Sequence, residues 1–585
     1  MKDNIFTVHI TPFLHSFLYI MKNSAFALLS ALSFSMAAQA QVAPAILSEH
    51  HAMLRVENQK KYLLLPVEEK QENAHIRIVR DNQLVGTINC RLAIDKVDYY
   101  VPYETRDGEL FDIAFAANSR ATGSIKGFTC WNKMKYADEF TEKVSEKFRP
   151  AYHHTPGHGW MNDPNGMFYK DGRWHLCYQW NPYASYWENM TWGHSSSADL
   201  IHWTPEPTAL VPDALGTIFS GSAVVDKTGS AGFGKDAIVL MYTSARERQT
   251  QSMAYSTDGG KTFTKYAGNP ILTADIPDFR DPKMFWNADA HCWNLILASG
   301  QEMWIYSSAN LREWKFESAF GHGYGNHGGV WECPDLMKMK VEGSDEEKWM
   351  LICNINPGGP FGGSATQYFI GSFDGHEFKC ESAPGVTKWM DYGKDHYATV
   401  TFDNAPSGRH VAMAWMSNWQ YANQVPTLQF RSANTIARDL GLYSYNGATY
   451  CSVKPAVEMD AARGAEIASP ATRCEIVVTL KGDARITLKN RLGERVTMTY
   501  DEAEGTFDMD RRRSGNVGFS DAFPCVTSAP THGRLRQLRL FIDHSSIEAF
   551  DADGRMAMTN LVFPSEPYSR IEIKGKAKAK IYAID

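Results

Sequence analysis

Three short segments each place a carboxylate one or two residues before a proline that leads into strand-forming residues. The segments are Asp163-Pro164, Asp281-Pro282 and Glu332-Cys333-Pro334. One such segment is typical of an ordinary turn, because Asp, Asn, Pro and Gly favour turns for local backbone reasons. The repetition favours a shared role for the three acids, with turn capping as the alternative.

Acids that share a site cannot all ionise freely, so their surroundings hold one protonated while another stays charged. Glycoside hydrolysis needs this division, because an acid protonates the leaving oxygen while a carboxylate attacks or activates water. The sequence places Asp281 118 residues after Asp163, and Glu332 51 residues after Asp281. These separations are close to two units and one unit of an internal repeat.

The repeat consists of a Ser, an Asp or Asn two residues later, and an aromatic residue four or five positions further on. Its copies are Ser197–Trp203, Ser256–Phe263, Ser308–Trp314 and Ser372–Phe378, and their acid or amide positions lie 59, 52 and 64 residues apart. Such spacing is typical of four-stranded blades with long loops. Residues 149–452 are therefore predicted to form a β-propeller, with the three acids on innermost strands facing a central funnel.

The regions on either side of the predicted propeller alternate short apolar runs with polar turns. This pattern predicts β-sandwich-like domains over residues 41–148 and 453–585, so the whole chain is expected to be all-β. In the first of these domains, Tyr99, Tyr100, Tyr103 and Trp131 are expected in the core, with a sugar-stacking face as the alternative.

The composition restricts the partners. The chain has 585 residues, a formal net charge of −7 and no basic stripe, which argues against nucleic acid and anionic membranes. An aromatic content of 12% suits a neutral carbohydrate. The ten cysteines lack close CxxC spacing and are expected to be mostly buried thiols, and no metal or cofactor motif is present, so no metal and no cofactor are expected. The oligomeric state is not indicated.

The N-terminus has the parts of a secretory signal: Lys22, an apolar run from Ala25 to Ala37, and the small-residue site Ala38-Gln39-Ala40. Residues 1–40 are interpreted as a signal peptide with an upstream extension, and a single long anchor is the alternative. No later segment is apolar for long enough to span a bilayer. We therefore expect an exported protein, periplasmic or extracellular, without a membrane span in the mature chain.

Several motifs resemble glycoside hydrolase family 32, which contains invertases, inulinases and levanases. They are Trp160–Gly166, Trp187–His194, Phe219–Ser222, Arg280–Pro282, Glu332-Cys333 and Leu538–Phe550. Residues 41–148 resemble a domain found before this catalytic unit in fructan-degrading gut Bacteroidetes. The resemblance implies a five-bladed propeller and a C-terminal β-sandwich. It also implies that Asp163 is the nucleophile, Glu332 the general acid and base, and Asp281 a ligand of the fructose hydroxyls.

The resemblance further implies sugar contacts from Asn162, Gln179, Trp187, Phe219, Ser220, Arg280 and Trp415. Each has a purely structural alternative, such as core packing for the two Trp residues or a strand edge for Gln179. The residue types add two expectations. Arg280 should keep the adjacent Asp281 ionised, and Trp187 should close an apolar wall over a sugar ring.

Together these observations predict a retaining β-fructofuranosidase that releases terminal fructose from levan, inulin or sucrose through a fructosyl-enzyme. A fructosyltransferase on the same scaffold is one alternative, because a sugar hydroxyl can replace water in the second step. A non-catalytic fructan-binding protein is the other, although such proteins typically lose an acid and this chain has all three.

Overall fold

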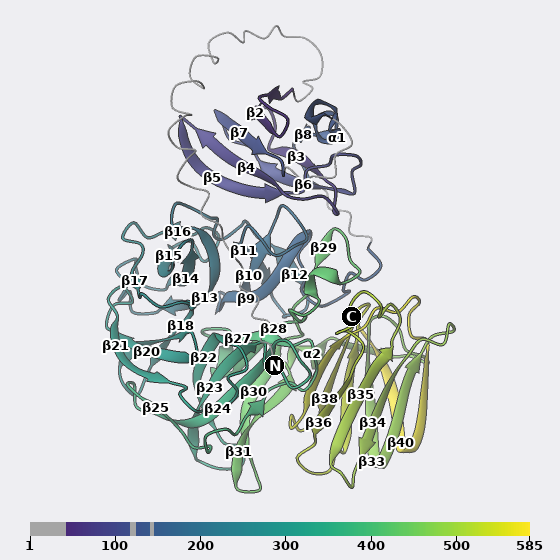
Figure 1. The fold of residues 1–585 in the computed structure, drawn as a ribbon. Coiled ribbons are helices and arrows are strands. Elements are labelled where there is room, and N and C mark those ends of the chain that lie inside the picture. The colour runs from purple at the N-terminus through teal and green to yellow at the C-terminus, as the bar shows by residue number, and fades with distance from the viewer. Residues whose placement is uncertain (1–42, 117–123, 141–145) are drawn as a thin grey trace, which may run out of the picture. The chain divides into compact units, whose positions relative to one another are not determined.

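The computed structural model describes residues 43–116, 124–140 and 146–585. The predicted signal peptide lies outside these residues. The described chain is dominated by strands, and its helices are short, with α1 at Thr129–Lys133 and α2 at Glu458–Ala461 (Figure 1). The prediction of an all-β protein is confirmed.

The N-terminal domain contains two sheets. One has the order β1 (Ala45–Ile46), β2 (His51–Arg55), β7 (Glu109–Ala114), β4 (Ala74–Arg80) and β5 (Gln83–Cys90), and the other β6 (Tyr99–Glu104), β3 (Tyr62–Val67) and β8 (Lys135–Ala137). Alternate side chains of β4 are buried, as a strand with one face on a core requires. Tyr99, Tyr103 and Trp131 are buried in this domain, which confirms their assignment to the core, whereas Tyr100 is half-buried.

Five further sheets follow. The first sheet contains β9 (Gly159–Lys170), β10 (Arg173–Asn181), β11 (Thr191–Ser197) and β12 (Trp203–Pro205), and the second contains β13 (Thr217–Asp226), β14 (Ala237–Ala245), β15 (Gln249–Ser256), β16 (Thr264–Lys265) and β17 (Leu272–Thr273). The third sheet contains β18 (Phe279–Asn287), β19 (Cys292–Ser299), β20 (Glu302–Ser308) and β21 (Lys315–Phe320), and the fourth contains β22 (Val330–Lys340), β23 (Glu347–Asn356), β24 (Ala365–Phe373), β25 (Phe378–Cys380) and β26 (Lys388–Trp389). The fifth sheet contains β27 (Tyr397–Thr401), β28 (His410–Trp415), β30 (Arg438–Tyr445) and β31 (Ala448–Pro455).

The first strands of these sheets form a closed ring. β9 contacts β13, β13 contacts β18, β18 contacts β22, β22 contacts β27, and β27 returns to β9. The short strand β29 (Phe430–Arg431), late in the chain, also pairs with β9, the first strand of the ring. Five antiparallel sheets arranged in a ring are the five-bladed β-propeller that was predicted.

The internal repeat has a structural role in the turns. In the first copy, Ser197 ends the third strand of its blade, and Asp199 accepts hydrogen bonds from the backbone N–H groups of Ile201 and His202 at 3.0 and 2.8 Å. Asp258 and Asn310 accept equivalent backbone hydrogen bonds in the next two copies. In the first four blades, the repeat therefore marks where the chain turns from the third strand toward the last.

Every inner strand of the propeller contains a β-bulge. The ladder shifts at Asn162-Asp163 in β9, at Ser220 in β13, at Asp281-Pro282 in β18, at Cys333-Pro334 in β22 and at Ala398-Thr399 in β27. Three of these residues have positive φ angles: Asp281 at 64°, Cys333 at 43° and Ala398 at 55°. Such conformations cost about 1–3 kcal/mol for a non-Gly residue, and bulges of this kind redirect side chains next to functional sites.

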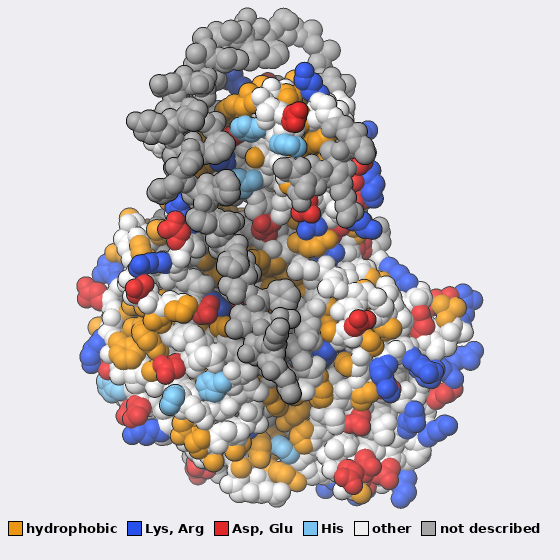
Figure 2. Space-filling model, in the orientation of Figure 1, with side chains coloured by type: hydrophobic (Ala, Val, Ile, Leu, Met, Phe, Trp, Pro, Cys, Tyr) orange, Lys and Arg blue, Asp and Glu red, His pale blue; other side chains and the backbone are white. Residues whose placement is uncertain are grey.

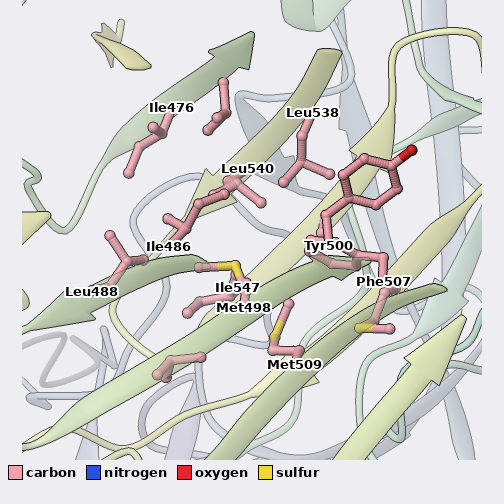
Figure 3. Close-up of a cluster of buried hydrophobic side chains, with 14 of the residues drawn as sticks. Ile476, Ile486, Leu488, Met498, Tyr500, Phe507, Met509, Leu538, Leu540 and Ile547 are labelled. Atoms are coloured by element: carbon pink, nitrogen blue, oxygen red, sulfur yellow. The ribbon is translucent and has the colours of Figure 1, made fainter. Parts of the chain in front are cut away.

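The C-terminal domain is a β-sandwich of β32 (Arg463–Glu466), β33 (Cys474–Lys489), β34 (Arg495–Asp501), β35 (Thr506–Arg513), β36 (Val526–Pro530), β37 (Gln537–Ile542), β38 (Ser546–Asp551), β39 (Ala557–Leu561) and β40 (Arg570–Ile584). The first part of β33 pairs with β37 and its last part with β34, so this long strand is shared by both layers. Its inward side chains, including Ile476, Ile486 and Leu488, pack against Met498 and Leu540 in one apolar core (Figure 3).

Charged side chains that are fully buried join the propeller to the sandwich. His153 contacts the carboxylates of Asp543 and Glu548 at 2.7 and 2.8 Å. Arg438 pairs with Glu548 at 2.5 Å and with Asp391 at 2.8 Å. A separate buried pair, Arg511 with Asp395, lies in the same interface and includes the hydroxyl of Tyr421. Because each charge has a partner, the interface satisfies the requirement for burying ions.

The surface and the cysteines agree with the expectations from composition. On the face drawn in Figure 2, side chains of both charges are interspersed. All ten cysteines lie in the described part of the chain; all are free thiols and seven are buried. Within the same part, no helix is both long enough and apolar enough to cross a membrane.

Candidate active site

A pocket of about 350 Å³ opens at the level of the inner-strand bulges. It brings together side chains from all five blades. Its lining consists of Asn162, Asp163, Gln179, Trp187, Phe219, Ser220, Arg280, Asp281, Glu332, Asn356, Tyr397 and Trp419. The three acids and six of the seven residues predicted as sugar contacts therefore share one pocket.

Asp163 is held by three donors. The Ser220 hydroxyl donates to Asp163 Oδ2 at 2.7 Å, the Cys333 thiol approaches the same oxygen at 3.5 Å, and the Asn162 amide donates to Oδ1 at 3.0 Å. Burial raises the pKa of Asp163, whereas the hydrogen bonds from Ser220 and Asn162 oppose this shift by favouring the charged form. The bulge at Asn162-Asp163 aims this carboxylate into the pocket.

Asp281 is the most deeply buried of the three acids, with 5% of its surface exposed. Its Oδ2 accepts a hydrogen bond from the backbone N–H of Cys333 at 2.9 Å, and the Cys333 thiol lies 3.5 Å from the same oxygen. The thiol of Cys333 thus contacts both Asp163 and Asp281. Burial and the neighbouring carboxylates raise the pKa of Asp281 to about 7, although Arg280 acts in the opposite direction.

Glu332 is fixed through both of its oxygens. Arg280 donates from Nε and Nη2 to Glu332 Oε1 at 3.1 and 3.0 Å, and the Tyr397 hydroxyl donates to Oε2. Burial and the charge of Glu332 raise the pKa of Tyr397 well above its usual range, so Tyr397 remains a donor across the ordinary pH range. The orientation of Glu332 is therefore set by two other blades.

The expectation that Arg280 would keep Asp281 ionised is wrong. Arg280 makes its hydrogen bonds with Glu332, Asp278 and Gln249, and its Nε lies 4.0 Å from Asp281 Oδ2. The bulge at Asp281 directs its carboxylate toward the next inner strand rather than toward the side chain of the preceding residue. Arg280 therefore reaches Asp281 only at the limit of ion-pair distance, and burial outweighs its charge in setting the pKa of Asp281.

The predicted sugar contacts occupy two kinds of position. Asn162 and Gln179 are buried at the base, where Gln179 donates to the backbone carbonyl of Ile218 at 3.0 Å. Trp187 and Phe219 form an aromatic wall, with ring centroids 6.0 Å apart and an interplanar angle of 66°. Trp187 is 42% exposed, which is unusual for such a large apolar side chain and leaves one face open to a ligand.

Trp415 does not line the pocket. Its side chain is fully buried and packs against Trp160 and Trp419, with ring centroids at 5.9 and 4.8 Å. Trp419, four residues later, lies at the pocket surface and stacks on Trp160 at 5.7 Å. The aromatic residue expected here is therefore provided by the loop after β28, since Trp415 itself ends that strand and points into the core.

Sequence reasoning also missed Tyr397 and Asn356. Tyr397 immediately precedes the bulge of the fifth inner strand, the position that Arg280 and Glu332 occupy in β18 and β22. Aligning the blades by register, rather than by an acid before proline, would have found it. Asn356 ends β23, the second strand of its blade, and no feature of the sequence marks it.

Within the part of the chain that the structure describes, no group of three or more His, Cys, Asp or Glu side chains is arranged to hold a metal ion. The pocket's polar groups are instead carboxylates paired with neutral donors and one guanidinium. Such a lining can orient hydroxyl groups and exchange protons with a neutral ligand.

A five-bladed propeller with three carboxylates in its funnel and a β-sandwich behind it defines a class of glycoside hydrolases. Comparison with models of protein families identifies the family within that class. The model described as the glycosyl hydrolases family 32 N-terminal domain matches residues 153–452, and the model for the family 32 C terminal matches residues 443–584. The chain belongs to glycosyl hydrolase family 32. Residues 48–152 match a separate domain of unknown function, DUF4980.

Individual relatives agree with this assignment. The levanase of Bacillus subtilis (strain 168) is 42% identical over 476 residues, which cover 75% of this chain and 70% of the relative. An extracellular exo-inulinase of Aspergillus ficuum is 35% identical, covering 72% and 90%. Among solved structures, exo-inulinase from Aspergillus awamori gives a TM-score of 0.71 at 32% identity, covering 76% of this chain and 99% of the other. A fructofuranosidase from Schwanniomyces occidentalis complexed with fructose gives 0.68 at 32% identity, covering 76% and 100%.

Proposed function

We propose that this protein is an exported β-fructofuranosidase that hydrolyses terminal fructose from fructans, with levan, inulin and sucrose as candidate substrates. The observation that carries the proposal is the convergence of Asp163, Asp281 and Glu332 from three inner strands in one pocket. The similarity to a levanase and to an exo-inulinase supports the substrate class, and the extracellular location of that exo-inulinase supports export.

In the proposed first step, Asp163 attacks the anomeric carbon of the fructosyl unit as the bond from that carbon to the leaving oxygen breaks. Glu332 donates its proton to the leaving oxygen, so the aglycone departs as a neutral alcohol and a covalent fructosyl-enzyme remains. Ser220 and Asn162 hold Asp163 in position for attack. Asp281 accepts hydrogen bonds from fructose hydroxyls and stabilises the positive charge that develops at the anomeric carbon.

In the second step, Glu332 is a carboxylate and removes a proton from water as the water oxygen attacks the anomeric carbon. The bond to Asp163 breaks and its electron pair returns to the carboxylate. Two displacements at one carbon give net retention of configuration. Arg280 and Tyr397 keep Glu332 oriented through both steps, since their hydrogen bonds occupy different oxygens of its carboxyl group.

The proposal is tested by incubating the protein separately with levan, inulin and sucrose and analysing the products. Free fructose released progressively from a chain end is the expected result. Predominance of longer oligosaccharides at high substrate concentration would instead support transfer to a sugar hydroxyl. Binding without turnover would support the non-catalytic alternative.

The role of Asp163 is tested with Asp163→Ala, which removes the nucleophile but leaves the pocket donors in place. We expect kcat to fall by at least about 10³-fold, as in other enzymes that lose one member of a catalytic unit. Asp275→Ala provides a matched control, because the Asp275 side chain is 88% exposed and does not line the pocket. Fructose release by Asp163→Ala at the wild-type rate would disprove the assignment.

A further inference from the structure

Residues 182–190 connect β10 to β11 and carry Trp187 to the rim of the pocket. Side chains of the N-terminal domain contact this loop on both sides of Trp187. The contacts involve charged and amide groups whose geometry is specific, rather than apolar packing alone. They provide a reason for the N-terminal domain to influence the pocket.

Before Trp187, the loop is anchored by Glu69 of the N-terminal domain. The Ser185 hydroxyl donates to Glu69 Oε1 at 3.0 Å, and the Tyr99 hydroxyl donates to Oε2 at 2.7 Å. Arg431 of the propeller lies 3.0 Å from Glu69 Oε1 and also donates to the backbone carbonyl of Ser185 at 2.7 Å. Glu69 is only 6% exposed, so its removal would leave the buried guanidinium of Arg431 without its carboxylate.

The next residue, Tyr186, packs against two guanidinium groups. Arg91 of the N-terminal domain lies 3.4 Å from the centroid of its ring, and Arg431 lies 4.4 Å from it. Cation–π contacts of partly desolvated groups contribute about 1–2 kcal/mol each. The side chain that directly precedes Trp187 is therefore held from both domains.

After Trp187, the loop is held by two amides of the N-terminal domain. Asn73 donates to Glu188 Oε2 and Asn89 donates to Glu188 Oε1, each at 2.6 Å. Asn89 and Asn189 also form a reciprocal pair, in which the Asn89 backbone N–H donates to Asn189 Oδ1 at 2.8 Å and Asn189 Nδ2 donates to the Asn89 carbonyl at 2.9 Å. Asn189 has a positive φ of 49°, an unfavourable conformation that these contacts stabilise.

We infer that the N-terminal domain is a positioning element of the substrate-binding rim, which holds Trp187 ready to contact a sugar unit. The inference rests on the proposed function for the identity of the ligand. The partners of Asp163, Asp281 and Glu332 described above all belong to the propeller, so the domain acts on substrate affinity and leaves the chemical steps unchanged. A preformed rim raises affinity because the loop loses less conformational freedom when sugar binds.

The double variant Asn73→Ala/Asn89→Ala tests the inference by removing both amides from Glu188. We expect KM for fructan oligosaccharides to rise about fivefold, equivalent to about 1 kcal/mol, while kcat stays within twofold of wild type. Gln83→Ala is the matched control, because Gln83 is an exposed amide at the start of β5 in the same domain. An unchanged KM, or an equal loss in kcat alone, would overturn the inference.

Two further variants at Glu188 keep the test decisive if the double variant folds poorly. In Glu188→Gln, the side-chain oxygen can still accept from Asn89, and the NH2 group can donate to Asn73 once the Asn73 amide is flipped, so KM should rise less than in Glu188→Ala, which should raise KM as the double variant does. In a double-mutant cycle, the effects of Glu188→Ala and Asn73→Ala/Asn89→Ala should be non-additive, because they remove the same contacts. Additive effects would contradict the proposed coupling.

A readout independent of activity separates this inference from the proposed function. Amide hydrogen exchange of residues 182–190 should become faster in Asn73→Ala/Asn89→Ala than in wild type, while β9, β18 and β22 remain equally protected. Failure of the wild-type protein to release fructose would refute the proposed function without affecting this measurement. Unchanged exchange in the loop would refute the positioning role even in an active enzyme.

Discussion

The propeller contacts its two neighbouring β domains through buried polar groups, yet the two sets of contacts hold different parts of the molecule. On the sandwich side, His153, Asp391 and Arg438 are fully buried, and none of them lines the pocket. On the N-terminal side, the contacts converge on Ser185 and Glu188, which flank Trp187 in the pocket rim. We therefore expect the sandwich interface to contribute mainly to stability and the N-terminal interface to contribute mainly to substrate affinity.

Arg438→Ala should produce the largest effect on stability. The substitution leaves the buried carboxylate of Asp391 without its counter-charge and leaves Glu548 with His153 alone, and breaking a buried pair in this way costs about 3–5 kcal/mol. Urea denaturation would measure the loss. Arg512→Ala is the control, because the Arg512 side chain is 61% exposed beside Asp510 and should cost less than about 1 kcal/mol. Equal losses in the two variants would contradict the comparison.

The pH dependence of stability should reveal the buried His153. Burial opposes its charge, but hydrogen bonds to Asp543 and Glu548 raise the pKa of His153 to about 9. Its folded pKa thus exceeds the unfolded value of about 6.5, so the stabilisation is complete below pH 6.5 and is lost as pH rises through 9. The free energy of unfolding should fall by about 3 kcal/mol over this window. His153→Gln should lack the slope, and an unaltered slope would assign it to another group.

Asp281→Asn should show that the pocket itself destabilises the fold. Burial raises the pKa of Asp281 to about 7, so the folded protein prefers the protonated form and the stabilising contribution is lost as pH rises from about 4 through 7. At pH 8 the neutral amide should increase the free energy of unfolding by on the order of 2 kcal/mol, while activity is lost. The gain should disappear at pH 4, and a gain of equal size at both pH values would exclude this explanation.

Trp187→Ala should have the smallest effect on stability. The side chain is 42% exposed, so the melting temperature should stay within about 2 °C of wild type, whereas loss of the aromatic wall should raise KM about fivefold. Steady-state kinetics with sucrose and with a fructan oligosaccharide would measure the change. A large fall in melting temperature with unchanged KM would show that Trp187 stabilises the fold and does not contact the sugar, which would contradict the difference between the two interfaces.

The sequence allowed the ring of blades and the three acids to be predicted, because both are encoded by local patterns. A carboxylate before a proline marks a bulge in β9, β18 and β22, and the Ser-x-Asp repeat marks blade turns. The prediction of individual pocket residues was less successful where tertiary packing determines which of two similar residues reaches the pocket. Trp415 and Trp419 are four positions apart, and only the end of β28 decides which ring reaches the pocket.

Electrostatics and domain contacts were also beyond local patterns. Arg280 follows Asp278 and precedes Asp281, but its principal partner Glu332 comes from another blade, 52 residues further along. Likewise, the amide of Asn89 contacts Glu188 across 99 residues, and although Glu188 lies in the Trp187–His194 motif, nothing in that motif indicates a partner in the N-terminal domain. Such pairs depend on how blades and domains pack, which the sequence does not display.

All five inner strands of the propeller have a bulge at the level of the pocket, and this shared backbone feature affects how such a site can evolve. Each blade places a residue beside the funnel in its bulge or directly before it: Asp163, Ser220 and Asp281 lie in their bulges, and Glu332 and Tyr397 directly precede theirs. The backbone that presents these side chains is set by the ladder rather than by their chemistry. A substitution at one of these positions can therefore change the reaction that the pocket catalyses while the fold of the propeller is kept. Evolution or protein engineering can thus exchange these side chains one blade at a time.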